Sequence, residues 1–255
     1  MGDDAMHNAL LEENYESILD EKFIKKVNNM SYFSLYVFCY DLLDEAVRNL
    51  SDNTVAALIK KVPQDALSEA LVEQYWCGDK LLHSAAQRKS PEVLMALVKK
   101  ASTDELSAAL LTRNSDRETP LHIAALYQSD KVFMALIEKV DQKSLSGALV
   151  MQDKIGRTPF HSAASRKSPN VLMALIANLY QNALSEALIQ QDKNGSTPLH
   201  IAARIPSKQN FMALIENLDQ NALSEVLVQQ NENGCTPLYL AEKSNYKFHY
   251  QKIIS

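Results

Sequence analysis

Four of the six histidines recur at one fixed interval along the chain, and this row of imidazoles is the first pattern that could do chemistry. Histidines that share a zinc ion must each place a ring nitrogen about 2.1 Å from the metal. Helices packed side by side lie about 8–10 Å apart, so histidines on successive repeats cannot reach one ion. We therefore expect no metal and no cofactor at His83, His122, His161 and His200.

A serine follows the histidine in two of these copies, which raises the question of nucleophilic catalysis. The same position holds Ile123 and Ile201 in two other copies, so Ser84 and Ser162 are not expected to be nucleophiles. The chain also lacks the G-x-S-x-G, H-E-x-x-H and G-x-x-x-x-G-K-[ST] motifs of hydrolases, zinc proteases and nucleotide-binding loops. The sequence predicts no catalytic residue and no enzyme activity.

The interval between the histidines is about 39 residues, a length typical of repeat proteins, and it holds from residue 41 onward. The tetrapeptide Thr-Pro-Leu-His or a variant of it starts at Thr119, Thr158, Thr197 and Thr236, and Lys80-Leu81-Leu82-His83 precedes them by the same step. Self-similarity at such a period indicates a solenoid. We divide the chain into an N-terminal piece, 1–40, and six units near 41–79, 80–118, 119–157, 158–196, 197–235 and 236–255.

Each unit has the pattern of three helices. Threonine is a good N-cap, and proline at the next position costs nothing because its missing N–H would be unpaired there. A second helix contains a Met-Ala-Leu segment, and a short third helix carries leucines at helical spacing, such as Leu184 and Leu188. The sequence predicts an all-α solenoid of about six units, each with two main helices and a short third helix, and a helical N-terminal cap over 1–40.

The string D-x-x-G-x-T-P-L-H-x-A-A, which starts at Asp153 and Asp192 and in a variant form at Asn231, strongly resembles the ankyrin repeat. The usual ankyrin unit has about 33 residues, so each copy here is about six longer, and the third helix accounts for the difference. The resemblance implies that the four histidines are structural and hydrogen-bond the Thr of their own unit and the backbone of the next. It also implies a protein-binding scaffold that does not catalyse a reaction.

Positions that differ between the copies are free to recognise a partner. In an ankyrin-like stack, the residues after the paired alanines line the concave surface, and here they are Arg88, Lys89, Leu126, Tyr127, Arg166, Lys167, Arg204 and Ile205. The corresponding candidates at the turn tips are Trp76, Arg117, Lys154 and Lys193. Tyr, Trp and Arg are the side chains that dominate interface energies. These cations around apolar residues favour a partner protein with an acidic or mixed surface.

The composition excludes some classes of fold and of binding partner. The chain has 26 Lys and Arg against 31 Asp and Glu, a net charge of −5, which argues against nucleic acid as the partner. The 1–40 segment holds seven acidic residues and three lysines, so it carries −4 and the repeats only −1. With 46% hydrophobic and 22% charged residues the chain can build a core, and six glycines are too few for a typical all-β fold. We expect a monomer.

The cellular location also has sequence signals. Three scattered cysteines make no disulfide framework, the N-terminus lacks the cationic start of a signal peptide, and the longest apolar run, from Tyr32 to Tyr40, is about half of a membrane span. These features predict a soluble, cytoplasmic protein with no membrane span. The lengthened repeats are similar to those of effectors from intracellular bacteria, which implies secretion into a host cell. An alternative is that the chain is the targeting module of an enzyme whose catalytic part lies elsewhere.

Overall fold

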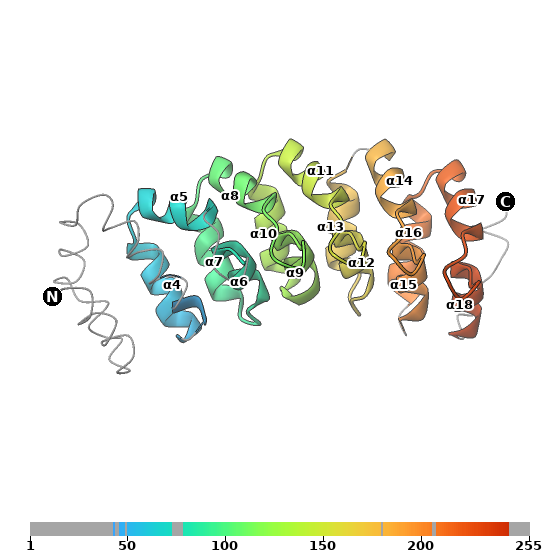
Figure 1. The fold of residues 1–255 in the computed structure, drawn as a ribbon, viewed down its shortest axis with the longest axis horizontal. Helices are drawn as coiled ribbons and strands as arrows, with labels where there is room; N and C mark the ends of the chain where they lie inside the picture. The colour runs from blue at the N-terminus through green and yellow to red at the C-terminus, as the bar shows by residue number, and fades with distance from the viewer. Residues whose placement is uncertain are drawn as a thin grey trace.

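The computed structural model describes residues 43, 46–48, 50–72, 79–179, 181–205 and 208–244. Every regular element in these ranges is a helix, which confirms the all-α solenoid of the sequence analysis. Figure 1 shows the helices stacked in three rows along an elongated array, with the third helices on one long edge. The expected cap at 1–40, Trp76 and the end of the sixth unit from residue 245 lie outside the described residues.

From the third unit onward, the first helix begins directly after the predicted capping threonine. Thr197 accepts a hydrogen bond from the His200 amide at 3.4 Å, and Thr236 accepts one from the Tyr239 amide at 3.2 Å. Proline occupies the first turn from the third unit onward, where no N–H is needed. The first helices are α6 (Leu81–Gln87), α9 (Pro120–Tyr127), α12 (Pro159–Ala164), α15 (Pro198–Arg204) and α18 (Pro237–Lys243).

The second helices carry the Met-Ala-Leu segment and its equivalent in the first unit, and they pack behind the first helices in the view of Figure 1. Their apolar faces are buried, with Phe133 and Phe211 fully enclosed, because apolar residues recur there at helical spacing. The second helices are α4 (Asp52–Lys61), α7 (Pro91–Lys100), α10 (Asp130–Lys139), α13 (Asn170–Ala177) and α16 (Lys208–Asn217).

The third helices account for the length that distinguishes these repeats. Acidic or hydroxyl side chains cap three of them: Ser102 accepts from the Glu105 amide at 3.2 Å, and Asp141 and Asp219 each accept from an amide in the first helical turn, both at 2.9 Å. Their leucines point into the stack, and Leu67 and Leu71 are fully buried. The third helices are α5 (Gln64–Val72), α8 (Thr103–Leu110), α11 (Gln142–Val150), α14 (Gln181–Ile189) and α17 (Gln220–Val228).

Small residues set the distance between successive units. The alanine pairs of the first helices are completely buried in the second to fifth units, as Ala124 and Ala125 illustrate. A methyl group at these positions lets the neighbouring helices approach closely, and a larger side chain would have to separate them. The paired alanines therefore hold the first helices close together, and the residues that follow them lie on a common surface.

Candidate partner-binding surface

The histidine row ties each unit to the next. The Thr158 amide donates to Nδ1 of His161 at 3.0 Å, and Nε2 of His161 lies 3.0 Å from the Ser196 carbonyl oxygen of the following unit. Because Nδ1 accepts a hydrogen bond, the ring proton is on Nε2 and the imidazole is neutral. Equivalent pairs of contacts are made by His83, His122 and His200.

Burial keeps these imidazoles uncharged. The pKa of His161 is lowered to about 4 by desolvation, and that of His83 is lowered to about 4 for the same reason. Burial lowers the pKa values of His122 and His200 as well. Within the described ranges, no three His, Cys, Asp or Glu side chains are placed so that they could hold a metal ion. Both ring nitrogens of each histidine are occupied by contacts within the stack.

The turns between units form a second set of ties. Oδ1 of Asp153 accepts hydrogen bonds from the Ile155 amide at 2.9 Å and the Arg157 amide at 2.8 Å, which fixes a tight turn. Backbone bonds then join successive turns: Lys154 N donates to Asp116 O at 2.7 Å, Lys193 N to Ile155 O at 2.9 Å, and Glu232 N to Asn194 O at 2.9 Å. The turn tips are thus held in a continuous line along the stack.

A third set of hydrogen bonds between successive units was not predicted from the sequence. Each unit from the second to the sixth has a polar side chain that follows its first helix or lies in the first turn of its second helix. This side chain donates hydrogen bonds to backbone carbonyl groups near the end of the first helix of the preceding unit. We call these residues the carbonyl clamps, and they are Arg88, Gln128, Arg166, Asn210 and Ser244. They satisfy C=O groups that a helix leaves without an internal partner at its C-terminus.

Arg88 and Arg166 have a role within the stack that the sequence did not predict. The Arg166 guanidinium donates to the carbonyls of Ala125, Leu126 and Gln128, the last at 2.8 Å, and lies 3.5 Å from Asp130. Arg88 contacts Asp52 and the carbonyls of the first unit in the same way. Both guanidinium groups are engaged between units, so the binding surface described below is built from the other candidates, and the part of Arg88 and Arg166 in partner binding stays a prediction.

Most of the remaining candidates for the concave surface are exposed, and two of them are apolar side chains at its centre. Tyr127 is 51% exposed and Leu126 39% exposed at the end of α9. Tyr127 stands one repeat from both Arg88 and Arg166, but its neighbour Gln128 supplies the clamp, with Nε2 bonded to the Ala86 and Arg88 carbonyls at 2.8 and 2.6 Å. Tyr127 is therefore not the clamp residue of its unit, and about half of it is exposed to solvent.

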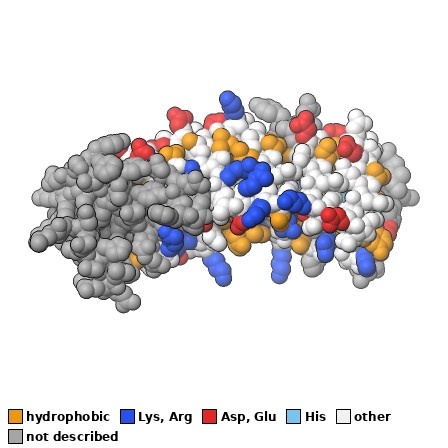
Figure 2. All heavy atoms as spheres, in the orientation of Figure 1, with side chains coloured by type: hydrophobic (Ala, Val, Ile, Leu, Met, Phe, Trp, Pro, Cys, Tyr) orange, Lys and Arg blue, Asp and Glu red, His pale blue; other side chains and the backbone are white. Residues whose placement is uncertain are grey.

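Cationic side chains lie in the units on both sides of Leu126 and Tyr127. Lys89 and Lys167 are exposed in the units before and after α9, and Arg204 is exposed at the end of α15, while Ile205 is half-buried. In the orientation of Figure 1, with the first helices nearer the viewer, Figure 2 shows Lys and Arg side chains across the middle and along the lower edge of this face. We name Leu126, Tyr127, Lys89, Lys167 and Arg204 the first-helix surface.

A family comparison identifies the architecture. A family model described as ankyrin repeats (3 copies) matches residues 43–146 and again residues 82–184, which together make more than half of the chain. The chain belongs to the ankyrin-repeat family. Ankyrin repeats are generally protein–protein interaction modules and are generally non-catalytic. No curated protein matches this chain. No helix in the described part of the chain is long and apolar enough to cross a membrane.

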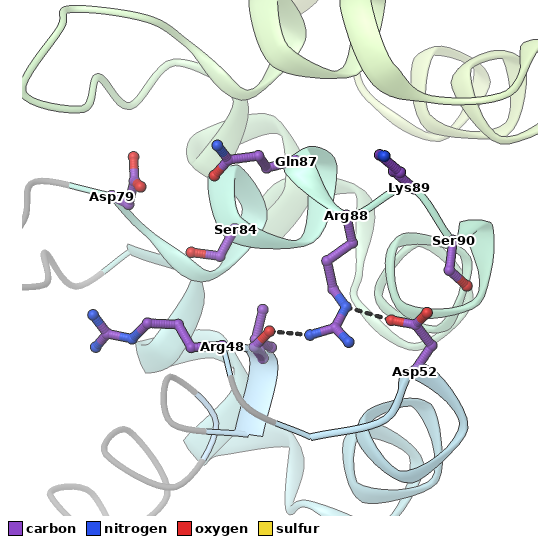
Figure 3. Close-up of a pocket in the computed structure, with 9 residues that line it drawn as sticks. Arg48, Asp52, Asp79, Ser84, Gln87, Arg88, Lys89 and Ser90 are labelled. Carbon is purple, nitrogen blue, oxygen red and sulfur yellow. Dashed lines mark hydrogen bonds and ion pairs between the residues drawn. The ribbon is translucent and has the colours of Figure 1, made fainter.

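The hollow between the first two ankyrin units belongs to the same face. It has a volume of about 710 Å³ and lies between the end of α6 and the start of α4. Figure 3 shows Arg88 crossing it to reach Asp52 and the Val47 carbonyl, with Lys89 and Gln87 at its rim. Its lining mixes both signs of charge and contains no histidine.

The carbonyl clamp can be tested in this ankyrin stack. Replacing Arg166 with methionine is expected to lower the free energy of unfolding by about 2 kcal/mol, because three carbonyl groups lose their donor. The matched control is Lys167→Met at the neighbouring exposed position, which is expected to change it by less than about 0.5 kcal/mol. Urea unfolding followed by circular dichroism measures both. Equal effects of the two substitutions would mean that the clamp contributes nothing to stability.

Proposed function

We propose that this chain binds another protein through the first-helix surface and the turn tips, and that it has no catalytic role of its own. The partner presents an acidic or mixed surface. The observation that carries the proposal is the exposure of two large apolar side chains, Tyr127 and Leu126, between the exposed lysines Lys89 and Lys167.

The chemistry of this surface fits a protein partner. A tyrosine buries a large area with few rotatable bonds and keeps a polar hydroxyl, which is why tyrosine is frequent among the residues that dominate binding energy. Exposed lysines at the rim attract Asp and Glu during the encounter and raise the association rate. The apolar centre then determines how slowly the complex dissociates.

The state of the histidines supports the absence of catalysis. A serine nucleophile needs a base with a free ring nitrogen within hydrogen-bond reach. In the fourth unit the imidazole of His161 has Nδ1 bonded to Thr158 and Nε2 bonded to the Ser196 carbonyl. It has no free nitrogen with which to accept a proton from the adjacent Ser162. The same contacts occupy His83 beside Ser84.

The place of action is part of the same proposal. If the chain is an effector of an intracellular bacterium, as the similarity of its repeats suggests, its partner is a host-cell protein. In the alternative, the chain is the targeting module of an enzyme whose catalytic part lies outside this sequence. In both cases the first-helix surface does the binding. Both remain predictions, and the length of the natural protein distinguishes the second.

The proposal is tested by photo-crosslinking followed by affinity measurement. A photoreactive phenylalanine at position 127 is expected to crosslink a specific protein, whereas the same group at Met173, which is 42% exposed on α13, is not. With the purified partner, Tyr127→Ala is expected to weaken binding at least about tenfold, mainly through faster dissociation. Lys167→Glu is expected to slow association and to reduce its salt dependence.

The melting temperatures of the two variants show whether a loss of binding reflects a loss of folding. Both positions are exposed, so both variants are expected to melt within a few degrees of the wild-type protein. Arg166 is unsuitable for this purpose because its loss would weaken the stack itself. Unchanged affinity in the Tyr127→Ala, Lys167→Glu double variant would move the binding site away from the first helices.

A further inference from the structure

We infer that the turn tips of the second to fourth units form a recognition strip for an acidic peptide segment with an aliphatic residue at its centre. The strip consists of Arg117, Lys154, Ile155 and Lys193, and Arg117 determines its specificity. The inference rests on the proposed function, since it names a partner chemistry for a protein-binding chain. It deepens that function by naming the turn tips of three units as the place of recognition, with features that the first-helix surface lacks.

The backbone of Arg117 is the first observation. Its φ is +61°, in the left-handed region, whereas the corresponding residues of the next three units are glycines with φ of +82°, +70° and +68°. Glycine adopts this conformation without steric cost, and a residue with a Cβ does not. The second unit thus keeps an arginine where its sister units have the residue that suits the backbone. Strained residues of this kind cluster at ligand-binding positions.

Ile155 is the second observation. It is 46% exposed at the tip of the third turn, where the sister units have the polar residues Asp116, Asn194 and Asn233. Exposed turns favour Asn, Asp and Gly because these residues hydrogen-bond their own backbone and tolerate turn conformations. An exposed β-branched aliphatic side chain contributes nothing to the turn. It is, however, an apolar contact that a partner can cover.

The charges that face outward from the strip are mostly positive. Arg117, Lys154 and Lys193 are all exposed. The neighbouring carboxylates Asp153 and Asp192 point into their own turns, where each accepts two backbone N–H groups. Charge complementarity therefore selects a partner with carboxylates on either side of its aliphatic residue.

Two other groups set the limits of this positive region. Asp116 lies 3.6 Å from the Lys154 ammonium, and both side chains are about two-thirds exposed, so a carboxylate of the partner can compete for that lysine. At the fifth unit the equivalent of Lys193 is Glu232, which ends the row of cations. The positive strip thus spans three turn tips, and an acidic segment would be excluded from the fourth.

The strip is also held in place before a partner arrives. Backbone bonds of 2.7 and 2.9 Å connect the second turn to the third and the third to the fourth. The Ile155 carbonyl accepts the second of these bonds, so the residue that carries the apolar side chain is anchored on both sides. A preorganised surface loses little conformational freedom on binding, and more of the interaction energy appears as affinity.

The test is a selection of random linear peptides displayed on phage against the immobilised full chain. Enriched peptides are expected to carry two or more Asp or Glu around Leu, Ile or Val. Fluorescence polarisation of the synthesised peptides then gives their dissociation constants. Arg117→Gly and Arg117→Ala are both expected to weaken binding at least about tenfold, since each removes charge-assisted hydrogen bonds. Ile155→Asn, which introduces the residue of the sister turn, is expected to weaken it as well.

The two Arg117 variants separate recognition from stability. Arg117→Gly removes the strain and is expected to melt at the same temperature as the wild-type protein or higher, although it binds poorly. Arg117→Ala keeps the left-handed Cβ and is expected to bind equally poorly without that gain. An arginine with a merely structural role would instead make Arg117→Gly less stable and leave peptide affinity unchanged. Lys143→Ala on α11 is the matched control for loss of an exposed cation elsewhere.

Other outcomes overturn the inference in distinguishable ways. Peptides that bind Arg117→Gly as tightly as wild type but lose affinity for Tyr127→Ala would refute the strip and support the first-helix surface. Enrichment of peptides without acidic residues would refute the charge argument. Duplex DNA that binds as tightly as the best peptide and with the same dependence on Arg117 would show a general polyanion site instead. No enrichment of any peptide would refute the strip, whereas the proposed function would be refuted separately by the absence of a specific crosslink at position 127.

Discussion

Lowering the pH from 7 to 5 is expected to reduce the free energy of unfolding by about 4 kcal/mol, because His83 and His161 must remain neutral in the folded chain. In the native state their pKa values lie at about 4, while an unfolded histidine has its ordinary value near 6.5. Between these values the unfolded chain binds protons that the folded chain does not. Stability is therefore complete above pH 6.5 and is lost as the pH falls toward 4.

The hydrogen bonds of the row explain why a proton is so unfavourable. A protonated imidazole carries hydrogen on both nitrogens, and in each copy Nδ1 faces a backbone N–H that already donates to it, as the Thr158 amide does to His161. Protonation would set two donors against each other in a buried site. His122 and His200 have lowered pKa values and act in the same direction. Glu118 acts in the opposite direction, since partial burial raises its pKa.

Urea unfolding at pH 7, 6, 5.5 and 5 measures this effect, and the slope of stability against pH counts the protons taken up. The carboxyl groups whose pKa values are lowered, Glu105, Asp141 and Asp219, titrate mostly below this range, so the histidines dominate it. His161→Gln is the control: it is expected to be less stable at pH 7 but to show a smaller slope. A flat profile between pH 7 and 5 would refute the structural assignment of the row.

The repeat could be predicted from the sequence because its most constrained positions hold one residue type. Buried alanines, capping threonines and the histidines each satisfy a geometry that no other residue satisfies as well, so they recur at one fixed step and expose the helices between them. The third helix was also predictable, since Leu184 and Leu188 and their counterparts mark a buried face at helical spacing. The core and the order of the helices followed from these patterns.

The carbonyl clamps could not be predicted because different side chains perform the same task. Arg, Gln, Asn and Ser can all donate to a carbonyl, and the clamps at positions 88, 128, 166, 210 and 244 are unevenly spaced along the chain. A search for a constant period misses such a set. For this reason Arg88 and Arg166 looked like variable surface residues, and the release of Tyr127 by Gln128 became evident only from their contacts.

The second large loss of stability is expected when buried leucines in a third helix, α14, are replaced with alanine. Leu184→Ala and Leu188→Ala in α14 should each lower the free energy of unfolding by about 2–5 kcal/mol, because the side chains are 2% and 1% exposed and each change leaves a cavity. Glu186→Ala, at an exposed position on the same helix, should change it by less than about 0.5 kcal/mol. Thermal and urea unfolding of the three variants measure these differences.

The set of helices that are destabilised is a more specific test of the packing than the total loss of stability. In a stack of repeats each unit contacts only its neighbours, so a weakened α14 should increase amide hydrogen exchange in α11 and α17, with which it packs, before it affects α5. The Ser185 hydroxyl, which bonds Asp219 of the next unit at 2.6 Å, carries part of this coupling toward α17. If Leu184→Ala and Leu188→Ala melt like the Glu186→Ala control, the third helix is not a docked element and the extra length of each repeat needs another explanation. If exchange rises equally in every helix, the stack unfolds as one cooperative unit and the nearest-neighbour description does not apply to it.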